Sequence, residues 1–467
     1  MNKSLRVLAI ALAVMFFLLL ANVTAGYMLR SDALKSDLRN SRVRDEQFGS
    51  HRGDILAGNA PIAGNNYTGV RPFLNERTYA NGELYAPVTG YFSYNYGAAG
   101  LESSHNDLLI GESDQQFVGR VIDTLSGRTQ QGGNVVTTID PAAQQAAWDA
   151  LAGQEGAIVA MDYTTGEIKA MVSTPSYNPA RLSSTDLDAA ASAWDELNAD
   201  PNQPMKNRAS KEIYPPGSTL KLVVSAAALA NGYTPDQMID TPARLQLPQT
   251  NHELPNASNC GDGQQTLDFA LSMSCNTSFA NIGMALGEEK IAEQAKKFGF
   301  GTALGKDFES TPSVYPSGMS QASLAMSAIG QYDVRATPLQ MTVVAGAIAN
   351  DGRVMQPYLV AEERDSNQKL LSKTKPTEFG RAMSAENAKT LQKMMQHVVS
   401  NGLGKPAQME GTVAGGKTGT AENEPGHLSS WYSGYMEQNH IAISVFVRNA
   451  RGGESIPMAK QVLEAMR

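Results

Sequence analysis

The most distinct hydrophobic feature of the chain is an uninterrupted apolar run near the N-terminus. Residues 7–29 contain no charged side chain, and Leu, Ile, Val, Phe and Ala dominate their centre. As a helix, this run would span about 34 Å, more than the roughly 30 Å of a bilayer core. A cleaved secretory signal is the alternative, since residues 23–25 form a small-residue Val-Thr-Ala site. The run is longer than the usual signal core, so the pattern favours a retained membrane anchor.

The pattern from the anchor to about residue 150 indicates a small, non-catalytic domain. Residues 31–50 carry many charges of both signs, which indicates a juxtamembrane linker or an exposed helix. Residues 51–133 are rich in Gly, Asn, Tyr and Ser without a strong helical period, which favours short strands and turns. Residues 134–139 predict a strand, and a helix follows with Asp140 as its cap and Pro141 in its first turn.

The pattern changes at Gly156, where longer regular elements begin. Residues 157–161 are apolar, residues 167–173 begin with polar–apolar alternation, and a turn separates the two segments, which predicts a β-hairpin. Residues 218–230 are apolar on almost every side and end before a glycine, which predicts a central buried helix. Further patterns predict helices at 187–197, 323–350 and 456–467, strands at 412–420, 431–436 and 441–447, and a charged surface loop at 363–376.

Strands at both ends of this region, with helices between them, indicate a mixed α/β (α+β) domain. We expect its central sheet to be mostly antiparallel, flanked by helices and assembled from the N- and C-terminal parts of the region. The expected organisation is a cytoplasmic tip and transmembrane anchor at 1–30, a β-rich pedestal- or dimerisation-like domain at 31–150, and a catalytic domain at 151–467.

Composition narrows the function only slightly. The chain has 467 residues and a net charge of −8, which gives no reason to expect nucleic-acid binding. Basic residues flank the anchor on both sides, so charge alone does not orient it. Its two cysteines, Cys260 and Cys275, could form a disulfide in an exported protein or remain buried thiols. Neither has a neighbouring His or Cys that would suggest a metal site, and we expect none.

Three short motifs occur in order along the chain: Ser218-Thr219-Leu220-Lys221, Ser274-Cys275-Asn276 and Lys417-Thr418-Gly419. This order is typical of serine β-lactamases and penicillin-binding proteins. Each is weak alone, because S-x-x-K also occurs at 366–369 and 372–375, and S-x-N occurs at three further places. Lys-Thr-Gly occurs once.

The surroundings of Ser218 select it as the candidate nucleophile. A Pro-Pro-Gly sequence precedes it, so a helix can begin there, and its N-terminal amides would favour a developing oxyanion. Lys221 lies one turn further along the same face, within expected reach of the serine. A serine needs a base, and an amine in an apolar helix near a second cation, Lys417, would lose its proton readily.

The other two motifs supply candidate partners for this pair. Ser274 could relay a proton between Lys221 and the leaving amine, and Asn276 could hold a substrate carbonyl. Lys417 and Thr418 suit a terminal carboxylate, and Gly419 would let a substrate strand approach closely. The main-chain amides of Ser218 and Thr420 would form the oxyanion hole.

The whole pattern resembles the class B penicillin-binding proteins, most of all the short actinobacterial penicillin-binding protein A type. The similarity spans nearly the full chain, and the matching segments are 52–56, 100–102, 156–175, 214–221, 330–341 and 415–422. Leu220 departs from the family's usual Phe, and Cys275 is unusual within Ser-x-Asn. With Cys260, it could tether the loop that carries Ser274 and Asn276.

This resemblance implies a peptidoglycan D,D-transpeptidase with a penicillin-binding, serine β-lactamase-like fold. Ser218 would attack the D-Ala-D-Ala bond of a donor stem, an acceptor amine would resolve the acyl-enzyme, and β-lactams would acylate the same serine. The family also implies an extracytoplasmic catalytic domain on a single-pass anchor, a multi-spanning glycosyltransferase partner, other division or elongation proteins, and no cofactor. The alternatives are a D,D-carboxypeptidase or β-lactamase, or a β-lactam sensor, on the same fold. The sequence does not distinguish septal from elongation roles.

Overall fold

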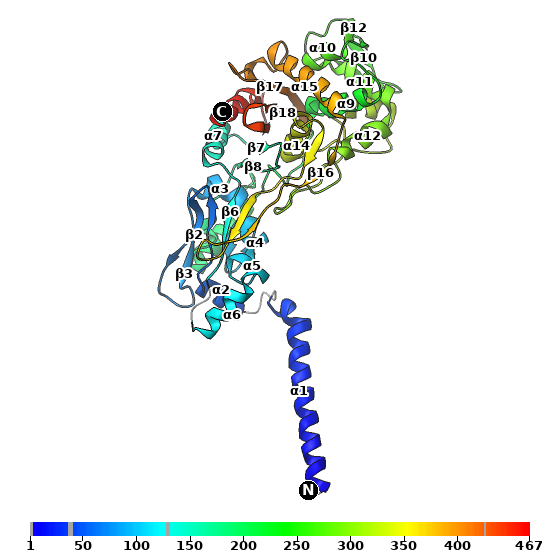
Figure 1. Ribbon diagram of the computed structural model, residues 1–467. Helices are drawn as coiled ribbons and strands as arrows, with labels where there is room; N and C mark the ends of the chain where they lie inside the picture. Colours follow the sequence, from blue (N-terminus) through cyan, green and yellow to red (C-terminus); the bar gives the residue numbers. More distant parts are fainter. Residues whose placement is uncertain (1–2, 36–40, 128–130, 425) are drawn as a thin grey trace.

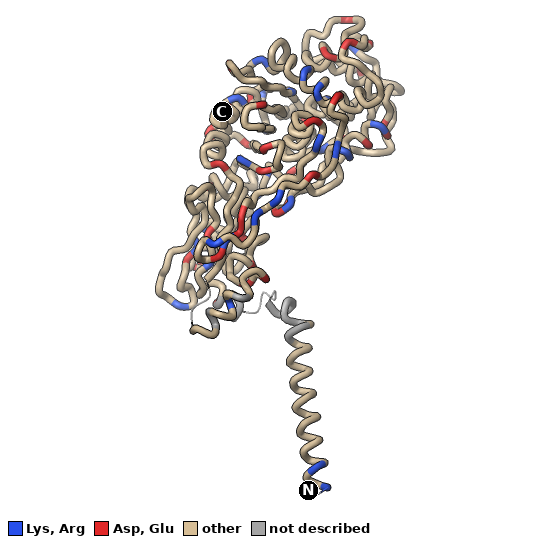
Figure 2. The backbone as a smooth tube through the Cα atoms, viewed as in Figure 1, with Lys and Arg blue, Asp and Glu red and all other residues tan. Residues whose placement is uncertain are grey.

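The computed structural model describes residues 3–35, 41–127, 131–424 and 426–467. A long helix, α1 (Lys3–Lys35), projects from an elongated body (Figure 1). Its segment Lys3–Gly26 is long and apolar enough to cross a membrane. The expected linker contains α2 (Ser41–Gly49), which buries Phe48, while residues 36–40 lie outside the described part. Lys and Arg mark the free tip of α1, and charges of both signs are interspersed over the body (Figure 2).

A six-stranded sheet, in the order β15-β14-β6-β1-β2-β3, forms the core of the region nearer α1. Its strands are β1 (Ile55–Ala57), β2 (Ala60–Tyr67), β3 (Asn75–Tyr79), β6 (Asn134–Thr137), β14 (Val360–Arg364) and β15 (Leu370–Lys373). The surface loop expected at 363–376 is therefore wrong, because β14 and β15 form a hairpin that extends this sheet. β14 pairs with β6, so the sheet combines residues from both sides of position 150.

Helices also occur in residues 51–133, where the sequence indicated only strands and turns. They are α3 (Gly82–Thr89), α4 (Gly100–Ser104), α5 (Asn106–Leu109), η1 (Asp114–Gln116) and α6 (Phe117–Leu125), with a small hairpin of β4 (Phe92–Ser93) and β5 (Gly97–Ala98). α7 (Pro141–Leu151) follows as expected, and the Asp140 carboxylate accepts the amides of Ala142 and Ala143 at 2.8 and 3.1 Å.

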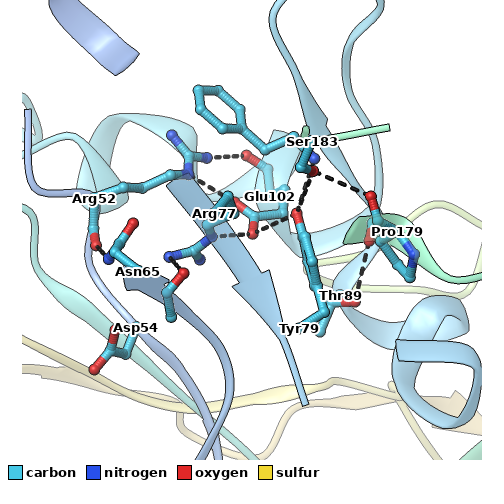
Figure 3. Close-up of polar contacts among 12 residues, drawn as sticks. Arg52, Asp54, Asn65, Arg77, Tyr79, Thr89, Glu102, Pro179 and Ser183 are labelled. Carbon is cyan, nitrogen blue, oxygen red and sulfur yellow. Dashed lines mark hydrogen bonds and ion pairs between the residues drawn. The ribbon is translucent and has the colours of Figure 1, made fainter. Parts of the chain in front are cut away.

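A buried ion cluster holds this region together (Figure 3). Glu102 accepts hydrogen bonds from Arg52 and Arg77, both at 2.6 Å, and all three side chains are buried. Burial alone would raise the pKa of Glu102, but the two guanidinium groups outweigh it and hold that pKa below its usual value. Tyr79 also donates to Glu102 at 3.1 Å and accepts from Ser183 at 3.5 Å, which links the cluster to the catalytic region.

The second sheet is antiparallel, in the order β17-β18-β19-β7-β8. Its strands are β7 (Gly156–Asp162), β8 (Ile168–Thr174), β17 (Ala414–Glu424), β18 (His427–Met436) and β19 (Ile441–Val447). Alternate residues face opposite sides, as the period of a strand requires. Val159 packs with α14 (Pro338–Ala349) in the cluster that also contains α9 (Lys221–Ala230), whereas Ile158 lies in the cluster with α7 and α16 (Ser455–Ala465). The expected mixed fold is confirmed.

The remaining helices belong to this domain. They are η2 (Pro179–Arg181), α8 (Leu187–Ala199), η3 (Gly217–Leu220), α10 (Leu267–Ser272), α11 (Asn276–Leu286), α12 (Glu288–Lys297), α13 (Gln321–Ala328), α15 (Ala385–Ser400), η4 (Lys405–Ala407) and η5 (Gln438–His440). Short strands complete it: β9 (Met238–Thr241), β10 (Arg244–Gln246), β11 (Glu253–Pro255), β12 (Gly263–Thr266), β13 (Arg353–Met355) and β16 (Glu378–Arg381). Two of the helices lie at its contact with the first region, where η2 packs against α3 and β3 and Trp194 of α8 stacks on the ring of Tyr96.

Candidate active site

The three sequence motifs meet at the edge of the second sheet. η3 and α9 carry the first motif, the link between α10 and α11 carries the second, and the edge strand β17 carries the third. Together they border a cleft of about 450 Å³. The motif residues on its wall are Ser218, Ser274, Asn276, Thr418, Gly419 and Thr420.

Ser218 is held beside β17 by close contact between main chains. Gly217 has φ +52°, and a Cβ there would lie 2.4 Å from the carbonyl oxygen of Thr420. The Gly217 amide donates to the carbonyl of Gly330 at 3.0 Å, and Gly330 would in turn clash with Gly217 if it had a Cβ. Only glycine fits at positions 217 and 330, so Gly217 sets the position at which the helical turn containing Ser218 begins.

The turn containing Ser218 is a 3₁₀ turn rather than the first turn of the α-helix that the sequence predicted. η3 covers Gly217–Leu220, and α9 starts at Lys221. The helix itself is buried along Lys221–Leu229, as its apolar pattern required. The N-terminal end of α9 still points at the cleft, with Ser218 half-buried just before it.

Lys221 is fully buried and points at the second motif. Its Nζ donates to the carbonyl of Ser274 and to Oδ1 of Asn276, both at 2.8 Å, and lies 3.3 Å from Oγ of Ser274. Burial, assisted by the nearby charge of Lys417, lowers the pKa of Lys221 well below its ordinary value. In the described part of the chain, Lys221 makes no hydrogen bond to Ser218, so the direct pair expected from their spacing is absent.

Ser274 and Asn276 owe their positions to an irregular link between two helices. Ser274 adopts φ +59°, which a non-glycine residue rarely does away from functional or turn positions. Cys275 directly follows it and forms a disulfide with Cys260, so the predicted bridge exists and ties this link to the 255–260 loop. The amide nitrogen of Asn276 donates to the carbonyl of Pro255 at 3.2 Å, which adds a second tie.

Lys417 lies buried on β17 and donates to the carbonyl of Thr418 at 3.0 Å. Burial lowers the pKa of Lys417 to about 7. A Cβ on Gly419 would lie 3.0 Å from Thr219 and 3.1 Å from the carbonyl of Pro216. The absence of a side chain at Gly419 therefore lets the turn that carries Ser218 pack closely against β17. The sequence had suggested instead that this space would admit a substrate strand.

Sequence reasoning missed several residues on the cleft wall. They are Ala257, Ser258, Asn259, Met273, Ile329, Gln331 and Leu403. The cysteine spacing was a usable signal for part of this set, because a bridge from Cys260 to Cys275 must bring residues 257–259 beside the Ser-Cys-Asn motif. The two other S-x-x-K serines, Ser366 and Ser372, lie in the β14–β15 hairpin of the first sheet, away from this cleft.

Comparison with known proteins shows the family to which the chain belongs. Residues 156–466 match the penicillin binding protein transpeptidase domain, and residues 52–135 match the penicillin binding protein A dimerisation domain. The chain is 39% identical to the peptidoglycan D,D-transpeptidase PbpA of Mycolicibacterium smegmatis, over 100% of this chain and 97% of that protein. It is 37% identical to PbpA of Mycobacterium tuberculosis, over 100% and 99% of the two chains.

Solved structures agree with the sequence comparison. The structure of M. tuberculosis penicillin-binding protein A as an imipenem acyl-enzyme complex superposes with a TM-score of 0.85 and 35% identity, over 90% of this chain and 99% of the other. The ceftriaxone acyl-enzyme complex of that protein gives a TM-score of 0.86 and 33% identity over the same shares. The chain therefore belongs to the penicillin-binding protein transpeptidases, in the class B group that includes mycobacterial penicillin-binding protein A.

Proposed function

We propose that this protein is a peptidoglycan D,D-transpeptidase whose nucleophile is Ser218. The observation that carries the proposal is the buried amine of Lys221, which lies between Ser274 and Asn276 beside the cleft that Ser218 borders. Such an amine supplies the base that a serine nucleophile needs. The named relatives act as D,D-transpeptidases, which supports the same reaction here.

The lowered pKa of Lys221 favours a neutral amine, and its contacts can accommodate one. A neutral amine has two N–H donors and one lone pair, and the two shorter contacts of Lys221 go to oxygens that can only accept. Its third neighbour, the Ser274 hydroxyl at 3.3 Å, can donate to that lone pair. The proton of Ser218 can therefore reach Lys221 through Ser274 when a substrate is in place, and the same route returns it to the leaving amine.

The reaction would proceed in two balanced steps. Oγ of Ser218 attacks the carbonyl of the penultimate D-Ala of a donor stem, an ester forms, and the terminal D-Ala leaves with the returned proton. An amine of an acceptor stem then attacks the ester, forms the new peptide bond and restores the Ser218 hydroxyl. The main-chain amides of Ser218 and Thr420 would stabilise the oxyanion in both steps, and an oxyanion donor of this kind is worth about 3–4 kcal/mol.

Lys417 and Thr418 would bind the terminal carboxylate of the donor stem. The Lys417 ammonium is buried, so a bound carboxylate would stabilise its charged form and raise its pKa in the complex. The oxygen of Asn276 accepts from Lys221, and one N–H of its amide donates to the carbonyl of Pro255. The second N–H of that amide can hold a substrate carbonyl at the cleft wall, so we assign Asn276 both to positioning Lys221 and to binding the substrate.

The proposed setting follows from the same chemistry. α1 anchors the chain in the cell membrane in a single pass, residues 1–30 forming the tip and anchor, 31–150 the non-catalytic domain and 151–467 the catalytic domain. The buried Cys260–Cys275 disulfide supports an oxidising, extracytoplasmic location for the catalytic domain. Peptidoglycan stems and β-lactams are its ligands, and a multi-spanning glycosyltransferase that supplies glycan strands is its expected partner.

Labelling with a fluorescent penicillin and intact-mass analysis test this proposal. Wild-type protein should form a stable penicilloyl adduct that maps to the peptide containing Ser218, and Ser218→Ala should form none while unfolding at an unchanged temperature. Retained covalent labelling of the variant contradicts the assignment of the nucleophile. Release of the adduct within seconds would instead favour a hydrolytic enzyme, because water would then replace the acceptor amine.

A further inference from the structure

Helix α6 (Phe117–Leu125) has a fully segregated apolar face. At about 100° per residue, its five apolar positions fill one arc of about 140°, and its other four positions fill the rest. The apolar positions are Phe117, Val118, Val121, Ile122 and Leu125. A helix patterned in this way normally buries its apolar arc.

The protein leaves this arc in solvent. Phe117, Val121, Ile122 and Leu125 are 56, 40, 53 and 84% exposed. Within the described residues, none of these four side chains belongs to the hydrophobic clusters that make up the cores of the protein. Soluble proteins seldom expose a contiguous apolar face that binds no partner, so we infer that a partner outside this chain's own core covers the apolar arc of α6.

α6 is connected to the end of the body that follows the anchor. Gln131, shortly after α6, pairs with His51, which follows α2 almost directly, and the Gly132 amide donates to the His51 carbonyl at 2.9 Å. α2 is the first described element after α1. Figure 1 shows α6 at the end of the body nearest α1.

A second exposed apolar segment lies against α2. Tyr67, the last residue of β2, and Val70, in the loop between β2 and β3, are 73 and 65% exposed. Phe73 of this loop packs edge-on against Phe48 of α2, with their ring centroids 5.9 Å apart. Two separate apolar protrusions are thus tied to α2, the element that the anchor leads into.

The connection to α1 limits how far this end can move from a bilayer. The apolar span of α1 ends at Gly26, and α2 starts at Ser41. Residues 27–35 continue the helix and rise about 14 Å, and the five residues after them reach at most about 20 Å. The start of α2 therefore stays within about 35 Å of the lipid, which is about the diameter of one compact domain.

We propose that α6 lies in the headgroup layer of the membrane that α1 crosses, with its apolar arc inserted among the acyl chains. This inference rests on the proposed anchoring by α1. Helices with a segregated apolar face lie flat in this layer. The occupant is lipid rather than a protein groove, because both apolar protrusions belong to the end of the body that the short tether holds near the bilayer.

Lipid contact can be measured on the full chain reconstituted into vesicles of phosphatidylethanolamine and phosphatidylglycerol. Ile122→Cys places a fluorescent label on the apolar arc, and Gly119→Cys, where a Cβ would meet nothing within 4 Å, places the same label outside the arc. Both native cysteines are in the disulfide, so labelling without reductant reaches only the introduced thiol. Penicillin labelling of each variant checks that the catalytic domain is folded.

The two labels should respond differently to two quenchers. Brominated lipid should quench the Ile122 label severalfold more strongly than the Gly119 label, and aqueous iodide should show the reverse order. Adding Val121→Gln and Leu125→Gln to the Ile122→Cys variant should abolish lipid quenching. Equal iodide access and no lipid quenching at both positions would overturn the proposal and point to a protein occupant. Carbonate extraction tests α1 separately, since loss of the protein from washed vesicles would show that the anchor itself fails.

Discussion

Replacing Lys221 with methionine tests the central element of the proposed mechanism. Methionine nearly preserves the length and packing of the side chain but removes the amine. A positioned general base contributes about 10²- to 10⁴-fold, so acylation by penicillin should slow by that factor. The corresponding rise in the barrier is about 3–5 kcal/mol.

The effect on folding must be separated from the effect on chemistry. Lys221 donates to the Ser274 carbonyl and to Oδ1 of Asn276, and both acceptors would lose this partner. An unsatisfied buried acceptor costs about 1–3 kcal/mol, and partial access from the cleft reduces that cost. The variant should therefore remain folded with a lower unfolding temperature.

Stopped-flow acylation at increasing penicillin concentration resolves the limiting rate constant from the half-saturating concentration. Lys221→Met should lower the limiting rate constant. Lys417→Met is the matched control, since it also removes a buried amine, but one assigned to carboxylate binding; it should chiefly raise the half-saturating concentration. A limiting rate constant for Lys221→Met within threefold of wild type would refute the assignment of Lys221 as the base.

Three further changes probe the rest of the site. Gly217→Ala places a Cβ 2.4 Å from a carbonyl oxygen at φ +52°, so the free energy of unfolding measured with denaturant should fall by about 2–4 kcal/mol, and acylation should be impaired. Gly232→Ala is the control, because φ is +86° there but no atom lies within 4 Å of the new Cβ; its free energy of unfolding should fall by only about 1–2 kcal/mol. Cys260→Ser with Cys275→Ala should cost about 3 kcal/mol in the same assay and slow acylation, because the bridge closes a loop of 15 residues beside the cleft. The pKa of Lys417 is about 7 in the folded protein and 10.5 in an unfolded chain, so the unfolded chain binds more protons between pH 7 and 10.5, and the free energy of unfolding should rise with pH across that window. Because Lys417 loses its positive charge above pH 7, the half-saturating penicillin concentration should increase there.

Local patterns were sufficient to predict the elements that are buried on defined faces. The segment at 218–230 was apolar almost all round and became the buried α9, and the apolar segment at 157–161 became β7 with its two faces in different cores. The hairpin at 360–373 was missed for a physical reason. Most of its side chains are partly exposed and either polar or charged, so it lacks an apolar alternation. Its pairing with β6 also joins residues more than 200 positions apart.

The candidate site shows the same division between local and distant information. Ser218, Lys221, Ser274 and Lys417 could be selected because their residue types and order suit acyl transfer. Their geometry could not, because the Ser274 main chain adopts a left-handed conformation and Lys221 turns toward it instead of toward Ser218. Spacing along a helix predicts which face a side chain occupies, but not which of several acceptors its amine will choose.

The groups around Lys221 and Lys417 determine which of the two buried amines carries the proton. Both are fully buried, and the charge of Lys417 lowers the pKa of Lys221, so the site favours a state in which only one of them is protonated. Lys221 has two acceptor oxygens for a neutral amine and a hydroxyl for its lone pair, whereas Lys417 lies on the cleft strand where a carboxylate would bind. A substrate carboxylate would hold the proton on Lys417 and leave Lys221 neutral. Binding of the correct substrate end would thus also keep the base in its active form.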